Sequence, residues 1–435
     1  MDSLEFLEIV LNNLYVYIVI LILTVVVYYC VFKSYFISLF DPFFLNQIFS
    51  VFATSVVLFL WIIGSIENKY GIQFALTQIA YWVGFCSYNI NDIKAHINSD
   101  VSDLQIKSHI VSKQTKYILV YIFVLFILLQ LFSYIKFGVP ILQQSRLALY
   151  EGSGGFGVVG RLIDTLKIFA MVGGFYLRGV SRPNSLYRVI ANLSILFGIL
   201  TYILSGSKST ILGLFSLYFF YLLMYYPSKL KTIRKYEIVG GIIAFGIALG
   251  VIFVQNSTES SIILFIRRMI GSGDVFYMGY SSDVISQIHA EPSMLFSDIL
   301  GTYRIVPREE IPRQIGLQLT TIMTNLELPM GPNARHNYLG LLCLGYGWSV
   351  LFSYILGRFY SYVRGKMYSK FYHKHILMVL FYITLLTAVS TFETDFTLFV
   401  STMNSFFISS VILLLLLFSI PIFMIAIANG VSKKK

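Results

Sequence analysis

The chain has 435 residues, of which 57% are hydrophobic and 12% charged, and its formal net charge is +11. Soluble domains carry about 25% charged residues, so this composition excludes an ordinary soluble fold. The mean hydropathy of +0.76 indicates a polytopic membrane protein with room for about ten spans of roughly 20 residues. Basic loops are expected beside anionic lipid, and we therefore predict a lipid bilayer and no nucleic acid as partner.

Apolar runs bounded by charged or turn residues predict an all-α membrane protein with eleven spans, within a range of ten to twelve. The predicted spans are 11–31, 46–66, 71–90, 117–135, 162–177, 189–204, 210–226, 238–254, 337–356, 376–389 and 407–428. Acidic residues precede the first span and no small-residue cleavage site follows it. We therefore expect a retained helix and not a removed signal peptide.

Basic residues predict which loops face the cytoplasm, because positively charged loops near spans are retained there. Lys433, Lys434 and Lys435 place the C-terminus inside. Counting back through the spans places twenty of the thirty-two basic residues in cytoplasmic loops and the N-terminus outside. Within a single integral domain of residues 1–435, the outer segments of interest are then 137–161, 255–336 and 391–405.

The first outer segments offer two candidate anion sites. Segment 137–161 predicts a short interfacial helix that carries Arg146, followed by a glycine-rich turn. The sequence SGSKST at 205–210 connects two spans and places Lys208 beside a helix N-terminus, where free N–H groups suit an anion. An ordinary capped turn explains the same residues equally well.

The long outer segment 255–336 carries six arginines on the side from which positive charge is normally excluded. They are Arg267, Arg268, Arg304, Arg308, Arg313 and Arg335. Prolines precede Arg308 and Arg313 directly and hold the backbone in an irregular conformation, which suits bidentate phosphate binding. We therefore predict a polyanionic ligand, while Arg267 and Arg268 also fit simple contact with lipid headgroups.

Three residues near these arginines are candidates for proton transfer. His336 follows Arg335 at the predicted start of the ninth span, where a histidine exchanges a proton near neutral pH. A structural histidine is the alternative. Glu393 and Asp395 lie in segment 391–405 and fit a base, sugar binding or ion pairing with the arginines. Within the fifth span, Asp164 and Lys167 are expected to pair with each other.

The three cysteines, Cys30, Cys86 and Cys343, lie far apart in apolar spans, a pattern of buried hydrophobic residues and not of a disulfide framework. No cluster of histidine and carboxylate has the spacing of metal ligands. We predict neither a metal nor a cofactor.

Several of these features together resemble the bacterial O-antigen (Wzy-type) oligosaccharide repeat-unit polymerases. They are the SGSKS turn, the paired Pro-Arg steps within 304–316, and the closing PN-x-x-HN-Y-L…G-x-G pattern of 331–348. The closing segment also resembles the O-antigen ligases. The resemblance implies a GT-C-like glycosyltransferase in the inner membrane with a periplasmic active face. Donor and acceptor would be glycans on undecaprenyl pyrophosphate, and a chain-length regulator protein is a further expected partner.

The resemblance and the residues together predict a metal-independent, inverting polymerisation. Arginines stabilise the departing pyrophosphate, and the candidates are Arg308, Arg313 and Arg335, with Arg146, Lys208 and Arg304 as further residues. His336 is the first candidate for general base, and Glu393 or Asp395 is the reserve.

Two alternatives stay open. The first is an O-antigen ligase that transfers glycan to lipid A–core; ligases resemble the pattern with an additional histidine that Gly331–Arg335 lacks. The second is a flippase or exporter of the lipid-linked oligosaccharide.

Overall fold

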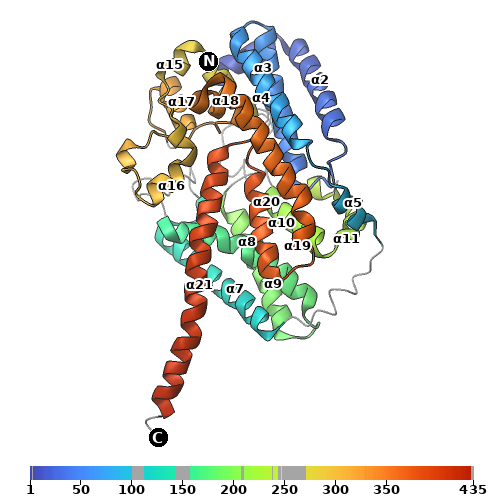
Figure 1. The fold of residues 1–435 in the computed structure, drawn as a ribbon, viewed down its shortest axis with the longest axis vertical. Coiled ribbons are helices and arrows are strands. Elements are labelled where there is room, and N and C mark those ends of the chain that lie inside the picture. The colour runs from blue at the N-terminus through green and yellow to red at the C-terminus, as the bar shows by residue number, and fades with distance from the viewer. Residues whose placement is uncertain are drawn as a thin grey trace.

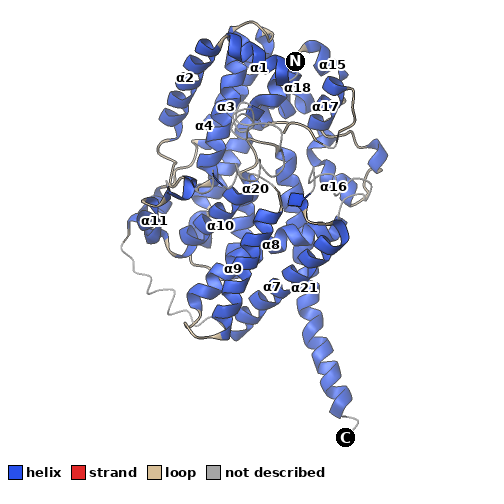
Figure 2. Ribbon diagram, turned by 180° about the vertical axis from the view of Figure 1, so that it is seen from behind, coloured by secondary structure: helices blue, strands red, loops and turns tan. Residues whose placement is uncertain are grey.

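A computed structural model describes residues 1, 3–99, 112–142, 157–206, 210–237, 239–242, 246, 271–328 and 330–432. Every regular element of this part is a helix, as the composition predicts (Figure 2). Six of the described helical segments are long and apolar enough to cross a membrane: Leu14–Phe32, Pro42–Ile62, Lys113–Leu142, Leu186–Leu204, His336–Lys366 and Phe396–Leu416.

The longer helices follow the predicted spans in chain order, apart from α1, which was not predicted as a span. They are α1 (Ser3–Asn12), α2 (Leu14–Phe32), α3 (Pro42–Ile62), α4 (Asn68–Phe85), α7 (Lys113–Phe137), α8 (Gly157–Val180), α9 (Leu186–Leu204), α10 (Thr210–Tyr225), α18 (His336–Ser361), α20 (Ile376–Val389) and α21 (Phe396–Ser432). The span predicted at 238–254 falls almost entirely outside the described residues.

Short helices fill the connections. They are α5 (Asn91–Asn98), η1 (Pro140–Leu142), α11 (Pro227–Arg234), η3 (Gly271–Gly273), α14 (Asp274–Gly279), α15 (Ser282–Gln287), η4 (Pro292–Phe296), α16 (Ser297–Thr302), η5 (Arg308–Glu310), α17 (Ile315–Thr324), the π-helical η6 (Tyr362–Lys366) and α19 (Tyr368–Phe371). Most of the predicted interfacial element at 137–161 lies outside the described part, which shows only η1 and the start of α8 there.

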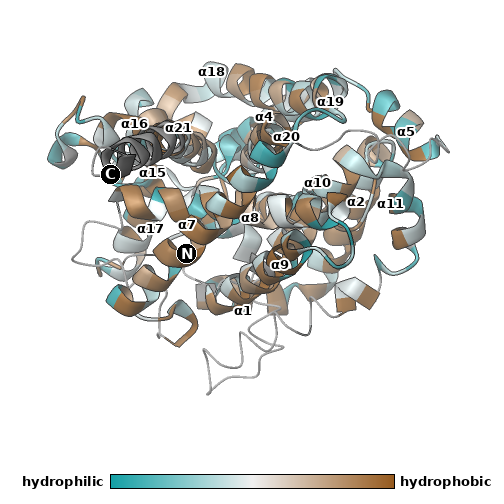
Figure 3. Ribbon diagram, turned by 90° about the horizontal axis from the view of Figure 1, so that it is seen from below, coloured by the Kyte–Doolittle hydropathy of each residue, from teal (hydrophilic) through white to brown (hydrophobic). Residues whose placement is uncertain are grey.

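Polar caps explain where two of the long helices begin. The Asp41 side chain accepts a hydrogen bond from Phe43 N at 3.1 Å, and Pro42 occupies the first turn of α3, where its missing N–H costs nothing. Ser112 accepts from Thr115 N at the start of α7. Helix α2 carries apolar side chains on its exposed face, among them Ile18 and Ile22, and such faces suit contact with lipid (Figure 3).

One end of the bundle, which we call the Arg364 end, gathers the connections that charge predicts to be cytoplasmic. Arg364 forms a buried ion pair with Asp41. Thr115 Oγ1 lies 3.0 Å from His375 Nε2, and Lys116 lies over the ring of Tyr187. Helices α5, α11 and α19 lie together at this end, at the right of Figure 1. That this end faces the cytoplasm remains a prediction from charge.

The opposite end, which we call the Ser282 end, brings together segments that are far apart in the sequence. Lys69 Nζ donates to Ser282 Oγ at 2.8 Å, and the rings of Phe6 and Tyr277 stack at 4.4 Å. The N-terminus, α15 and α17 lie together here, at the top of Figure 1. The described parts of the predicted outer segments 255–336 and 391–405 also meet, because the rings of Phe296 and Phe396 pack edge-on with centroids 6.0 Å apart.

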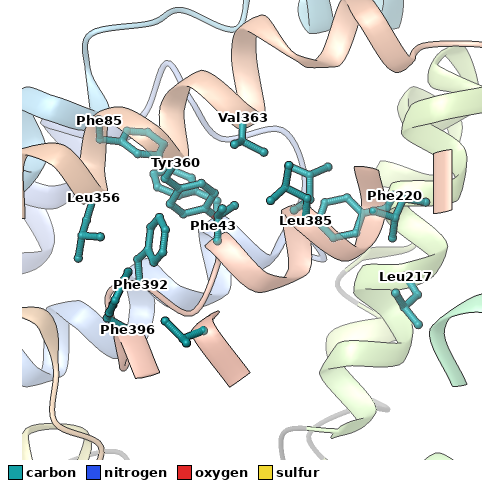
Figure 4. Packing of buried hydrophobic residues seen from close by; sticks show 14 of the residues in the cluster. Phe43, Phe85, Leu217, Phe220, Leu356, Tyr360, Val363, Leu385, Phe392 and Phe396 are labelled. Carbon is teal, nitrogen blue, oxygen red and sulfur yellow. The ribbon is translucent and has the colours of Figure 1, made fainter. Parts of the chain in front are cut away.

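Aromatic packing holds the two ends together. The rings of Phe43 and Phe85 stack in parallel with centroids 4.3 Å apart, and Tyr360 packs edge-on against both. Phe392 and Phe396 continue this cluster toward α21 (Figure 4). The loop that carries Glu393 is thereby anchored to the core on both sides.

Candidate active site within the helix bundle

Helix α18 is not the straight ninth span that the sequence predicts, because the chain reverses at Gly345. Gly345 has φ 76° and ψ −178°, a conformation that only glycine adopts readily. His336 Nδ1 lies 3.0 Å from Ser353 Oγ, whereas seventeen residues of straight helix would separate them by about 25 Å. Residues 336–344 therefore fold back against residues 346–361 as a helical hairpin.

The hairpin carries the start of α18 into the interior of the bundle. Gln73 Nε2 on α4 donates to Asn337 O at 3.0 Å and to Ser349 Oγ at 3.3 Å, so one side chain joins both arms. Asn337 Nδ2 donates to Thr77 Oγ1 at 2.9 Å. His336 thus lies level with the middle and far part of α4, and not at the mouth of a span as the sequence predicts.

Arg335 joins three segments through its guanidinium group. Its Nε donates to Ser272 O at 3.0 Å, Nη2 donates to Phe49 O at 3.2 Å, and Nη1 contacts Glu393 O and Ser50 Oγ at 3.4 Å. The residue is 7% exposed and adopts a strained φ of 27°. Its donors are occupied by protein oxygens, so the geometry favours a positioning role over capture of a phosphate.

Glu393 is a buried carboxylate in the loop between α20 and α21. Gln47 Nε2 donates to its Oε1 at 2.7 Å, and Ser50 Oγ donates to its Oε2. Ser50 also receives the long contact from Arg335 and therefore bridges the cation and the carboxylate. A buried carboxylate needs such donors, because an unpaired one costs several kcal/mol.

Asp395 fixes the same loop to the segment before α18. Its Oδ2 accepts from Ala334 N at 3.2 Å, and its Oδ1 accepts from Thr397 N and Thr397 Oγ1 at 2.8 and 2.7 Å. Arg335 N donates to Thr394 O at 2.9 Å. Both oxygens of Asp395 therefore hold backbone and cap α21, an arrangement that favours a structural role.

The hydrogen bonds of His336 assign its tautomer. The Ser353 hydroxyl donates to Ser349 O at 2.9 Å, so its oxygen accepts from Nδ1–H of His336. In the neutral imidazole Nε2 is then the basic nitrogen. The ring stacks on Tyr81 with centroids 4.8 Å apart. Tyr81 and Ser353 thus fix the ring orientation that a general base requires.

A second polar network lies at the start of α8. Arg161 Nη1 and Nη2 donate to the two Asp298 oxygens at 3.0 and 2.8 Å, and Asn404 Nδ2 donates to Asp298 Oδ2 at 2.7 Å. Burial alone would raise the pKa of Asp298, but these hydrogen bonds outweigh it and hold the pKa below its usual value. The network joins α8, α16 and α21, which come from all three predicted outer segments.

Two of the other predicted phosphate-binding residues, Arg304 and Arg313, have described side chains, and neither joins the cluster around Glu393. Arg313 pairs with Glu327 at 2.9 Å on the surface, and Arg304 is exposed with φ 52°. Arg308 begins η5. Arg146 and Lys208 lie outside the described residues. The cluster therefore contains Arg335, His336, Glu393 and Asp395 from the sequence prediction.

Four residues of this cluster were missed by sequence reasoning: Gln47, Ser50, Tyr81 and Ser353. A signal existed for the first two, because Gln47 and Ser50 are polar, lie three residues apart on one face of an apolar span, and are both buried. Ser353 gives no such signal, since its contact depends on the reversal at Gly345.

No protein-family model, no curated protein and no solved structure matches this chain.

Proposed function

We propose that this protein is a membrane glycosyltransferase that polymerises undecaprenyl-pyrophosphate-linked oligosaccharide repeat units into O-antigen or a related surface polysaccharide. The proposal places its active face on the periplasmic side of the inner membrane. The observation that supports it best is the meeting of two segments that lie more than fifty residues apart in the sequence: one carries Arg335 and His336, and the other carries Glu393 and Asp395.

The proposed chemistry assigns one task to each residue. His336 Nε2 accepts the proton of the acceptor hydroxyl as that oxygen attacks the anomeric carbon, and undecaprenyl pyrophosphate leaves from the opposite face with inversion. Arg335 and Asp395 position the segment that carries His336. Glu393, held by Gln47 and Ser50, balances the buried charge of Arg335. Arg308 and Arg313 remain the proposed phosphate ligands.

Purified protein and a defined lipid-linked repeat unit test the proposal. We expect a ladder of products from the wild-type protein, formed equally in the presence of a chelator. His336→Asn should slow it by about 10²- to 10⁴-fold, the usual contribution of a general base. His289→Asn is the matched control, because His289 is exposed at the Ser282 end. A normal ladder from both His336→Asn and Glu393→Gln would refute the assignment.

A deletion of the gene separates polymerase from ligase. Loss of a polymerase leaves core lipid that carries one repeat unit, whereas loss of a ligase leaves bare core.

The flippase alternative gains one specific observation. Asp164 and Lys167 lie within the bundle on α8, and neither side chain forms an ion pair or hydrogen bond with the residues that the structure describes. Charged side chains inside a membrane bundle are typical of substrate paths. Transfer of a fluorescent lipid-linked glycan across liposomes that contain the purified protein, without any polymer, would favour this alternative.

A further inference from the structure

The helices at the Arg364 end surround a small cavity. It lies where α5, α10, α18, η6 and α20 meet the segment that precedes α3, and Phe220 on α10 and Tyr360 on α18 approach it from different sides (Figure 4). Every side chain that lines it is less than a tenth exposed. Most of the lining is apolar, and the polar groups come from Asp41, Tyr360, Arg364 and Tyr382.

The volume of this cavity limits the size of its occupant. About 10 Å³ is open to the centre of a water molecule, which is close to the least that one buried water needs. A phosphate or carboxylate group is too large for this space. Cavities that stay dry in proteins are apolar, whereas four polar side chains line this one. Its size and lining together suit a single water molecule.

The charges beside the cavity already balance each other. Arg364 Nη1 donates to Asp41 Oδ1 at 2.8 Å, and Nη2 donates to Asp41 Oδ2. Nη2 also donates to Tyr35 O at 2.9 Å, and the guanidinium group lies 4.7 Å from the centroid of the Phe43 ring. A buried cation that is paired in this way needs no further anion, so a neutral molecule suits the site.

One donor of the same guanidinium group has no partner. Arg364 Nε is buried and forms no hydrogen bond with the residues that the structure describes. The Tyr360 hydroxyl group interacts with the guanidinium group, but it does not lie in hydrogen-bond geometry with Nε. Buried polar atoms without a partner are rare, and an ordered water is one of the few explanations for them.

We propose that the cavity holds one ordered water molecule, which accepts a hydrogen bond from Arg364 Nε and donates one to the Tyr360 hydroxyl oxygen. The water completes the hydrogen bonds of the ion pair that joins the start of α3 to η6. Helix η6 is π-helical, and π-helical turns occur frequently at functional sites. The proposal is independent of the proposed function, because it uses no step of the polymerisation.

A cryo-EM map of the full-length protein in nanodiscs, at a resolution that shows ordered water, tests the site directly. We expect one spherical peak at about 2.7–3.2 Å from both Arg364 Nε and the Tyr360 hydroxyl oxygen. A peak too large for water overturns the proposal, as does a Tyr360 hydroxyl group bonded directly to Nε. The absence of a peak, in a map that shows other buried waters, also overturns it.

The Tyr360→Phe variant removes the hydroxyl group and keeps the ring. The loss of one hydrogen-bond partner should lower the folding equilibrium constant in detergent by about 2- to 10-fold. Tyr29→Phe is the matched control, because Tyr29 is exposed, and it should change the constant by less than about twofold. Equal folding constants for the two variants would contradict a water held by Tyr360.

X-ray radiolysis supplies a readout in solution, since hydroxyl radicals formed from a bound water modify the side chains beside it. Tyr360 should be modified although it is only 3% exposed. Tyr338 is also buried, and its hydroxyl group donates to Gly279 O at 3.1 Å, so it should stay unmodified. Background modification of both tyrosines would overturn the proposal.

Discussion

Replacement of Arg335 by methionine removes the cation that joins η3, α3 and the Glu393 loop. The side chain is nearly the same length, so the change isolates charge and hydrogen bonding. Two of the four contacts, at 3.0 and 3.2 Å, have ordinary hydrogen-bond lengths, and the other two are longer. Removal of one partner from a buried charged cluster costs about 3–5 kcal/mol, a large part of a typical net stability of about 5–15 kcal/mol.

Thermal unfolding in detergent measures this loss, and the chain offers a matched control. Arg313→Met removes the same group from an ion pair whose side chains are 48% and 74% exposed, which is worth about 0–1 kcal/mol. We therefore expect Arg335→Met to unfold at a clearly lower temperature than Arg313→Met.

A double substitution tests the reason for the loss. Glu393→Gln removes the charge that Arg335→Met leaves unpaired. The double variant should therefore lose about 1–3 kcal/mol less stability than the sum of the losses in the two single variants. The buried-charge argument for this cluster is wrong if the two losses of stability simply add, or if Arg335→Met and Arg313→Met unfold at the same temperature.

Three other predictions concern the fold and its pH dependence. Gly345→Ala should destabilise the protein by about 1–3 kcal/mol, because φ 76° with ψ −178° strains any other residue. Gly347→Ala is the control and should change the unfolding temperature little, since a Cβ there also meets open space but the backbone has no positive φ. Equal effects of the two substitutions would argue against the hairpin. Gly84→Ala should also destabilise, since a Cβ there would lie 2.2 Å from Tyr354 O, and normal unfolding of that variant would contradict the close contact of α4 with α18. The pKa of Asp298 is lowered in the folded protein, so this carboxylate stabilises the fold fully above its unfolded pKa of about 3.9, and the stabilisation is lost as pH falls through the lower folded pKa. The Asp298→Asn variant should therefore be less stable than the wild type at neutral pH and should lose less stability below about pH 4. Unfolding measured at a series of pH values tests this.

Much of the fold follows from apolar runs and charge. The predicted span 376–389 coincides with α20, and the predicted 210–226 differs from α10 by one residue, because runs bounded by charge leave little freedom in where a helix ends. The connections predicted to share the cytoplasm gather at the Arg364 end. The all-helical character is confirmed for the described residues, while the number of spans and the GT-C-like arrangement remain predictions.

The interior of the site was harder to predict. The resemblance marked His336 and Arg335, but a regular apolar pattern runs on through Gly345 and gives no sign of the reversal. The direction of α18 is set by contacts from α4, such as Gln73 to both arms, and these depend on tertiary packing. The same limit applies to Asp164 and Lys167. A spacing of three residues permits an ion pair, and the two groups do interact electrostatically. No direct ion pair between them is present in the described structure, where Lys167 lies over the Tyr202 ring.

The separation of Arg335 from its carboxylate has a consequence for how the protein is made. Glu393 is synthesised 58 residues after Arg335, after the whole of α18, η6 and α20. During that interval the arginine has no anionic partner in this cluster, and a lone guanidinium is not stable in hydrocarbon. The arm that holds it must therefore wait near the aqueous boundary and enter the bundle only after the α20–α21 turn has been inserted, which makes the assembled site a product of late folding within the membrane.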